Sequence, residues 1–163
     1  MKIGLISDTH GTLPAEVFQV FEGVDAIVHA GDIGVEDIII ELQVLAPVYA
    51  VFGNVDDSTL RQRYPLWRME QLGGKNVLVT HIIAPLTPAG LQHAFEKIGC
   101  SQHPDILIYG HTHELCIQKV GDILTINPGS VSQPRKGAPP SVAFLEINAN
   151  GEAKCWPHYL KAD

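Results

Sequence analysis

Residues 2–11 read KIGLISDTHG, an unbroken apolar run that passes directly into Asp8-Thr9-His10. An apolar run of this length, bounded by polar residues, is typical of a buried strand, and we expect one over residues 2–7. Two helices and two further strands are then expected in alternation, over residues 14–22, 26–30, 35–45 and 48–52. The order strand-helix-strand-helix-strand predicts parallel strands joined by right-handed crossovers.

The rest of the sequence changes from this alternation to hairpins. Pairs of segments flank short turns that contain glycine, which is a hairpin signal; the pairs are residues 67–72 with 76–80, 115–120 with 123–126, and 141–147 with 152–159. A helix over residues 88–98, ended by Gly99, and a strand over 105–109 lie between them. We therefore expect an α/β protein in which two mixed sheets pack face to face with helices outside.

The composition excludes several classes of protein. The 163 residues are the length of one ordinary domain, and we expect a single domain over residues 1–163. The net charge of −7 argues against nonspecific binding to nucleic acid, which needs a basic face. No segment approaches the roughly 20 apolar residues of a membrane span, and Asp8 comes too early for a signal peptide. Widely spaced cysteines fit a reducing compartment, so we expect a cytoplasmic protein without membrane contact.

Five of the predicted strands are followed immediately in the sequence by side chains that can bind metal ions. Ligands of open α/β sheets bind in the crevice beyond the carboxyl ends of the strands, so we expect these side chains to meet. They are Asp8, His10, Asp32, Asn54, His81, His111 and His113. Glycines at positions 11, 31, 53 and 110 would let the backbone turn and approach closely.

The chemistry of this set favours a pair of divalent cations. Nitrogen and oxygen ligands without a thiolate suit Mn²⁺, Fe, Zn²⁺, Ni²⁺ or Co²⁺. Two such ions about 3.5–4 Å apart can clamp the attacking and leaving oxygens of a phosphoryl transfer, and a carboxylate such as Asp32 can bridge them. Their charge outweighs that of Asp8 and Asp32, so a phosphate ester anion is attracted, and the pKa of a bound water falls toward about 7.

Each of these residues has an ordinary structural explanation when it is taken alone. Asp8 and Asp32 could cap helices or lie in turns, Asn54 could be a turn residue, and His81 could be a hydrogen-bonded core histidine. The metal interpretation is favoured because all of them follow strands of one chain. His29, inside a predicted strand, is expected to support its neighbours rather than bind a metal.

The motifs at the strand ends resemble the calcineurin-like metallophosphoesterases. The matching blocks are Asp8-Thr-His10, Gly31-Asp32, Gly53-Asn54, His81 and Gly110-His111-Thr-His113, and with Asn127-Pro-Gly-Ser130 the small chain is similar to the compact bacterial and archaeal phosphodiesterase branch. The resemblance covers essentially the whole chain and implies a four-layer α-β-β-α sandwich of two mixed sheets. It also implies that one metal is held by Asp8, His10, Asp32 and His113, and the other by Asp32, Asn54, His81 and His111.

The same resemblance implies an enzyme that hydrolyses small phosphate esters, most readily phosphodiesters. A hydroxide that bridges two divalent ions, Mn²⁺ first among them, would attack phosphorus in line. The catalytic residues would be Asp32, Asn54 and His81, with His81 or a metal-bound water assisting the leaving group.

Two positions depart from the family pattern. Many members carry a histidine after the ligand asparagine, where it serves as general acid, but this chain has Val55. General acid catalysis contributes typically about 10²–10⁴-fold, so we expect a preference for good leaving groups. Many members also read His-Gly-His where this chain has His81-Ile82-Ile83, so apolar residues replace a group that could help to hold substrate.

Several alternatives stay open at this point. The same fold resembles a retromer coat subunit that binds proteins, and a phosphomonoesterase or nucleotide pyrophosphatase could use the same residues. Asn127 and Ser130 are interpreted first as turn residues, with support of the neighbouring site residues as the lesser alternative. Arg135-Lys136 is interpreted as a solvated basic loop, with contact to a substrate phosphate as its lesser alternative. The sequence leaves the oligomeric state open, with a homodimer among the options.

Overall fold

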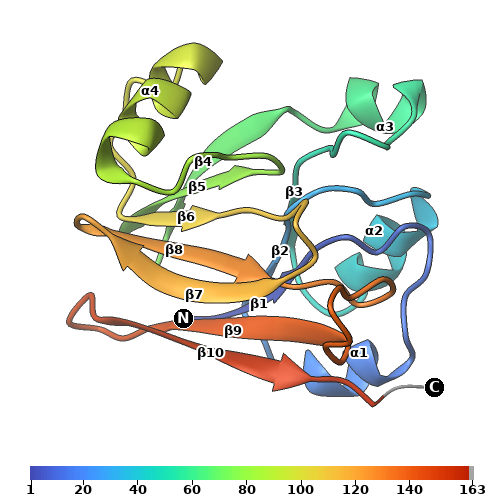
Figure 1. Ribbon diagram of the computed structural model, residues 1–163. Coiled ribbons are helices and arrows are strands. Elements are labelled where there is room, and N and C mark those ends of the chain that lie inside the picture. The colour runs from blue at the N-terminus through green and yellow to red at the C-terminus, as the bar shows by residue number, and fades with distance from the viewer. Residues whose placement is uncertain (162–163) are drawn as a thin grey trace.

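The computed structural model describes residues 1–161, which form two five-stranded sheets and four helices (Figure 1). The strands are β1 (Lys2–Ile6), β2 (Ala26–His29), β3 (Val48–Ala50), β4 (Trp67–Leu72), β5 (Lys75–Thr80), β6 (Ile106–Ile108), β7 (Leu115–Val120), β8 (Ile123–Pro128), β9 (Ser141–Ile147) and β10 (Ala153–Tyr159). The helices are α1 (Glu16–Val20), α2 (Asp37–Gln43), α3 (Ser58–Arg63) and α4 (Pro88–Ile98).

Both sheets are mixed, as the sequence predicts. The first has the order β10-β9-β1-β2-β3, in which β1, β2 and β3 are parallel and the β9–β10 hairpin is added antiparallel to β1. The second has the order β4-β5-β6-β8-β7, in which β5, β6 and β8 are parallel and both edge strands are antiparallel. The first sheet therefore carries hairpin strands at one edge of its parallel strands, and the second carries an antiparallel strand at each edge.

Apolar side chains fill the space between the sheets and beneath the helices. Leu5 and Val79 belong to the layer between the two sheets. Phe21 belongs to the cluster that joins α1 and α2 to the first sheet, and Leu91 belongs to the cluster that joins α4 to the second (Figure 1). The result is the predicted α-β-β-α sandwich.

The helix boundaries show where local signals in the sequence are strong. α4 has the predicted bounds because Thr87 Oγ1 accepts a hydrogen bond from Gly90 N at 3.1 Å and Gly99 ends the helix at φ 75°. α1 and α2 are shorter than predicted, and α1 begins at Glu16 rather than at Pro14. α3 was not predicted from the sequence, although Asp57 caps it by accepting a hydrogen bond from Leu60 N at 3.0 Å.

Among residues 1–161, no helix combines the length and the apolar character that crossing a bilayer requires.

Candidate metal centre

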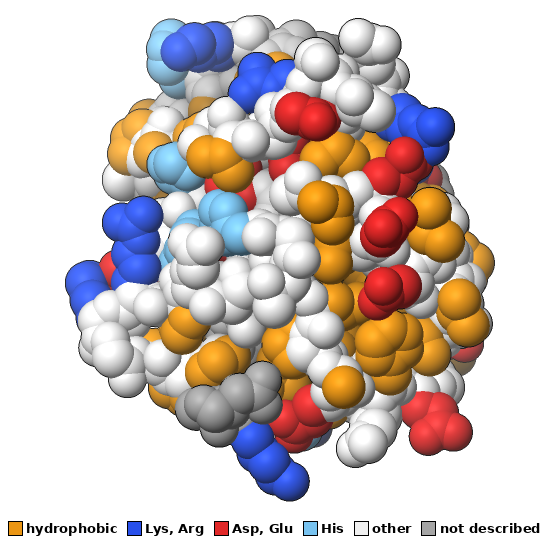
Figure 2. Space-filling model, turned by 90° about the vertical axis from the view of Figure 1, so that its right-hand side faces the viewer, with side chains coloured by type: hydrophobic (Ala, Val, Ile, Leu, Met, Phe, Trp, Pro, Cys, Tyr) orange, Lys and Arg blue, Asp and Glu red, His pale blue; other side chains and the backbone are white. Residues whose placement is uncertain are grey.

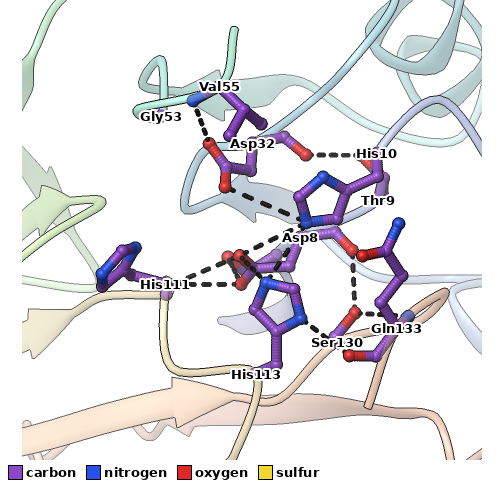
Figure 3. A network of polar contacts seen from close by, with 12 residues as sticks. Asp8, Thr9, His10, Asp32, Gly53, Val55, His111, His113, Ser130 and Gln133 are labelled. Atoms are coloured by element: carbon purple, nitrogen blue, oxygen red, sulfur yellow. Dashed lines mark hydrogen bonds and ion pairs between the residues drawn. The ribbon is translucent and has the colours of Figure 1, made fainter. Parts of the chain in front are cut away.

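The residues singled out at the strand ends meet at one end of the sandwich. They follow five different strands: Asp8 and His10 follow β1, Asp32 follows β2, Asn54 follows β3, His81 follows β5, and His111 and His113 follow β6. Figure 3 shows Asp8, His10, Asp32 and His113 turned toward one another. Contacts between their polar atoms divide the set into two groups that share one aspartate.

The first group brings together two carboxylates and two imidazoles. One ligand atom from each of Asp8, His10, Asp32 and His113 lies within 4.8 Å of the others. The Nε2 atom of His113 is 3.2 Å from Asp8 Oδ1 and 3.2 Å from the Nε2 atom of His10. Two ring nitrogens that face each other at this distance need a proton or a cation between them. The donor set therefore fits a divalent metal ion.

The second group lies on the other side of Asp32 and contains the amide side chain. Asn54 Oδ1 is 3.1 Å from His81 Nε2 and 2.9 Å from His111 Nδ1. His81 Nε2 is also 3.2 Å from Asp32 Oδ2. Asp32 thus contacts both groups, through His10 at 3.9 Å on one side and His81 on the other.

Backbone carbonyls fix the orientation of two of the imidazoles. His113 Nδ1 donates a hydrogen bond to the carbonyl of Gln133 at 2.7 Å, and His81 Nδ1 donates one to the carbonyl of Ala30 at 2.7 Å. When either ring is neutral, its proton therefore lies on Nδ1 and the Nε2 lone pair faces the centre. This is the arrangement that ligating histidines require.

The two carboxylates are buried without a lysine or arginine beside them. Asp8 is 0% and Asp32 is 2% exposed, and within residues 1–161 their ion-pair partners are histidines alone. Burial raises the pKa of Asp8, although Ser7 Oγ donates to its Oδ2 atom at 2.6 Å and opposes the effect. Buried carboxylates without a fixed cation fit a site that is completed by metal ions.

Asp32 and His81 act as a pair. Burial alone would raise the pKa of Asp32, but the hydrogen bond with His81 and the Val55 backbone N–H, 3.1 Å from Asp32 Oδ1, lower it (Figure 3). Burial would lower the pKa of His81, but the Asp32 hydrogen bond and the charge of Asp8 raise it. A metal ion that binds to His81 competes with the proton that the imidazole would otherwise take up. The affinity for the metal ion therefore falls as the pH falls.

The backbone at the centre takes up conformations that non-glycine residues rarely adopt. Of the non-glycine residues with positive φ in the described chain, all but Lys136 belong to the site, namely Asp8, His10, Asp32, His111 and His113. Such conformations cost free energy and occur mainly at functional sites. They turn the side chains that follow each strand back toward the centre.

Two glycines are required because other site atoms occupy the position of a side chain. A Cβ atom on Gly53 would collide with Asp32, and one on Gly110 would collide with Ser7 Oγ and lie 2.8 Å from Asp8 Oδ2. Close approach at both glycines was predicted from the sequence.

A second set of residues braces the loops that carry the site; this role was not predicted for Asp56 and was the lesser alternative for Ser130. Asp56 is buried and accepts hydrogen bonds from Gly34 N at 2.8 Å and Gly53 N at 2.7 Å. Ser130 Oγ donates to the carbonyl of Asp8 at 2.8 Å and accepts from Gln133 N at 2.9 Å (Figure 3). An aspartate two residues after a candidate ligand was the signal available for Asp56, and a serine in a buried turn was the signal for Ser130.

Other polar residues singled out in the sequence have structural partners. Asn127 Nδ2 donates to the carbonyl of Gly110 at 2.9 Å, which adds a bracing role to its place in the turn. His29 is fully buried and contacts Thr9 Oγ1 at 3.0 Å, as a supporting residue would. Lys136 Nζ is 2.9 Å from Glu114 Oε1, and Arg135 is exposed, so the basic loop is solvated.

Comparison with known proteins gives one consistent family. A family model described as the calcineurin-like phosphoesterase superfamily domain matches residues 1–150. A probable metallophosphoesterase of Methanothermobacter thermautotrophicus is 37% identical over 91% of this chain and 87% of its own. The phosphodiesterase MJ0936 of Methanocaldococcus jannaschii is 32% identical over 85% of this chain and 89% of its own.

A solved structure extends the comparison to the fold. Vps29 of Entamoeba histolytica in complex with Zn²⁺ superposes with a TM-score of 0.74 at 23% identity, covering 98% of this chain and 99% of that protein. At this identity the similarity concerns the architecture of the two sheets and their helices.

Proposed function

The chain belongs to the calcineurin-like phosphoesterase superfamily, and we propose that it is a phosphodiesterase that works with two divalent metal ions. The observation that supports this most strongly is the pair of ligand groups that share Asp32. The phosphodiesterase name of a relative 32% identical to this chain supports the type of ester.

In this proposal the two groups of side chains hold one ion each. The ligands are Asp8, His10, Asp32 and His113 for one ion, and Asp32, Asn54, His81 and His111 for the other. Nitrogen and oxygen donors of this kind suit Mn²⁺, Fe, Co²⁺, Ni²⁺ or Zn²⁺, and we propose Mn²⁺. When bound, the ions supply positive charge for the phosphoryl oxygens and activate water at neutral pH.

Groups of the protein itself position the side chains that would bind the metal ions. Asp32 contacts a histidine of each group, so its carboxylate would be available to both metal ions. The carbonyls of Ala30 and Gln133 keep the protons of His81 and His113 on the Nδ1 atoms, away from the centre. Held in this way, the Nε2 atom of His81 would serve as a ligand, and while it binds a metal ion it would carry no proton for a leaving group.

The immediate surroundings support a diester rather than a monoester substrate. An open pocket of about 240 Å³ adjoins the centre at Asn54 and His81, and another of about 300 Å³ adjoins it at His113. A phosphodiester carries two organic groups, and pockets beside both ligand groups give each of them a place. Arg135 lines the second pocket, where its charge favours an anionic or polar group.

The direct test is hydrolysis of bis(p-nitrophenyl) phosphate by the metal-loaded protein. We expect turnover with Mn²⁺, its loss after chelation, and a rate lowered by orders of magnitude in Asp32→Asn, which removes the shared carboxylate. Turnover of p-nitrophenyl phosphate under the same conditions measures the diester preference. If the loaded protein hydrolyses neither ester, the proposal is wrong, and faster hydrolysis of the monoester would change it to a phosphomonoesterase.

The second candidate is a protein-binding scaffold like Vps29. The similarity of fold supports it, and because Vps29 itself is described as a zinc complex, metal binding alone does not separate the two functions. Exposed apolar side chains at Val55, Leu66 and Ile82 also suit a protein interface. A protein that binds two ions per chain yet hydrolyses no phosphate ester would favour the scaffold.

We also propose a reducing, cytoplasmic location and a small phosphate ester as the substrate. Support for the location comes from Cys100, Cys116 and Cys155, which are all unpaired.

A further inference from the structure

The pocket at Asn54 and His81 has apolar walls that the metal-binding groups do not explain. Phe52, Leu66 and Ile82 line it, and the side chains of Leu66 and Ile82 are 51% and 49% exposed. On the face shown in Figure 2, hydrophobic side chains lie directly beside the histidines. Apolar surface is thus exposed to solvent at the edge of a strongly polar centre, where it can contact a bound molecule.

Hydrogen bonds within the protein hold the walls of this pocket in place. The Arg61 guanidinium donates to the carbonyl of Asn54 at 2.7 Å and lies 5.3 Å from the centre of the Phe52 ring. Trp67 Nε1 donates to the carbonyl of Ile98 at 2.8 Å and ties the end of α4 to the start of β4. The pocket is therefore largely formed before a ligand binds, which reduces the entropic cost of binding.

The size and charge of the pocket define what it can accept. At about 240 Å³ it is smaller than the roughly 300–1,000 Å³ of pockets for drug-sized ligands, so it takes one part of a substrate. None of the side chains that line it is acidic, and Arg61 adds a positive charge, so a phosphate anion beside it is not repelled. Since Asn54 and His81 form one wall, a group in the pocket lies directly next to a phosphate held at the metal centre.

We propose that this pocket binds an apolar ester group of the substrate, such as an aryl ring, and that Leu66 and Ile82 determine this specificity. The inference rests on the proposed phosphodiesterase function and extends it to the class of substrate. Ile82 stands where many members of the superfamily have glycine, so the departure at this position adds an apolar side chain to the pocket where those members have none.

Binding of two phosphonates to the Mn²⁺-loaded protein, measured by calorimetry, tests the pocket without requiring turnover. Phenylphosphonate and methylphosphonate present the same anionic group, and only the first can fill the pocket. We expect phenylphosphonate to bind at least about tenfold more tightly, as is usual for an apolar group in a matching pocket. In Leu66→Asn and Ile82→Asn its affinity should fall toward that of methylphosphonate. Val44→Asn, at an 81% exposed position that ends α2, is the matched control and should keep the wild-type ratio.

The outcomes separate this inference from the proposed function. Equal binding of the two phosphonates, with hydrolysis of bis(p-nitrophenyl) phosphate intact, overturns the pocket assignment and leaves the function standing. A tenfold preference that survives in both pocket variants also overturns it, because the ring then binds elsewhere. Equal binding together with self-association that Leu66→Asn abolishes would assign the surface to a second copy of the chain. A loaded protein that binds neither phosphonate and hydrolyses no ester would overturn both.

Discussion

The Nε2 atoms of His10 and His113 lie 3.2 Å apart, although 103 residues separate the two histidines along the chain. Both rings direct a nitrogen at the space in which Asp8 and Asp32 also place a carboxylate oxygen. Four donor atoms are held close together there before any ion binds.

Metal binding should stabilise the protein, because the folded chain presents ligands that the unfolded chain does not hold together. At a free Mn²⁺ concentration 100 times the dissociation constant, the free energy of unfolding should rise by about 2.7 kcal/mol for one site. Thermal unfolding with Mn²⁺ and with chelator measures the gain. His113→Gln should reduce it, whereas His103→Gln, an exposed residue 3.1 Å from Asp122, should not. An unchanged Mn²⁺ effect in His113→Gln would contradict the ligand assignment.

Gly53→Ala should disrupt the centre, because the new Cβ atom would collide with Asp32. The φ angle of Gly53 is not positive, so the effect comes from the collision and not from backbone strain. We expect a loss of about 1–3 kcal/mol in the free energy of unfolding and a lower metal content per chain. Gly74→Ala is the control, since φ there is +81° but a Cβ would meet no atom within 4 Å. This control should be somewhat destabilised and should still bind metal fully. A full metal content in both variants would show that a Cβ atom at position 53 does not disrupt the centre.

His29 should make the metal-free protein less stable in acid. Burial lowers its pKa from 6.5 to about 3, and its Nδ1 atom already accepts the Gly31 N–H at 3.2 Å, which leaves no place for a second proton. Between pH 6.5 and about pH 3 the unfolded chain therefore binds more protons at His29 than the native chain does. The contribution of His29 to the free energy of unfolding is fully present above pH 6.5 and is lost as the pH falls through this range. The expected slope is about 1.4 kcal/mol per pH unit.

Chemical unfolding from pH 7 to pH 4 in wild type and His29→Gln measures this contribution as a difference in slope. The comparison with wild type is needed because Asp8 and Asp32 also titrate in acid, with pKa values shifted in opposite directions. His93→Gln on the exposed side of α4 should keep the wild-type slope. Equal slopes in wild type and His29→Gln would show that His29 does not titrate as described.

Val55→His should restore a proton donor beside the centre. The Val55 side chain is 57% exposed, and its contact with Asp32 Oδ1 comes from the backbone N–H, which the substitution keeps. Diesters with poor leaving groups should be hydrolysed faster, by up to about 10²–10⁴-fold, while bis(p-nitrophenyl) phosphate, whose leaving group needs no proton, should change little. The slope of log rate against leaving-group pKa in wild type and variant is the measurement. Equal acceleration of all esters would contradict a general acid role.

Local signals in the sequence predicted most of the fold. The helix over residues 88–98 was predicted with its observed bounds, and Gly99 was the signal for its end. The structure adds that Thr87 caps its start, which is also a local interaction. The hairpin turns and the parallel strands also follow from local patterns. α3 was missed because it is short, with Leu60 its buried apolar residue, so that periodicity gave no signal.

The sequence by itself determined which chemical groups stand at the strand ends, because apolar runs specify strands and the residues after them are read directly. Only the tertiary structure decided how these groups divide into two sets around Asp32, and which nitrogen of His81 and His113 faces the centre. These choices depend on carbonyls and hydrogen bonds from segments distant in sequence, such as Ala30 beside His81. They arise only when both sheets are packed, so no local pattern records them.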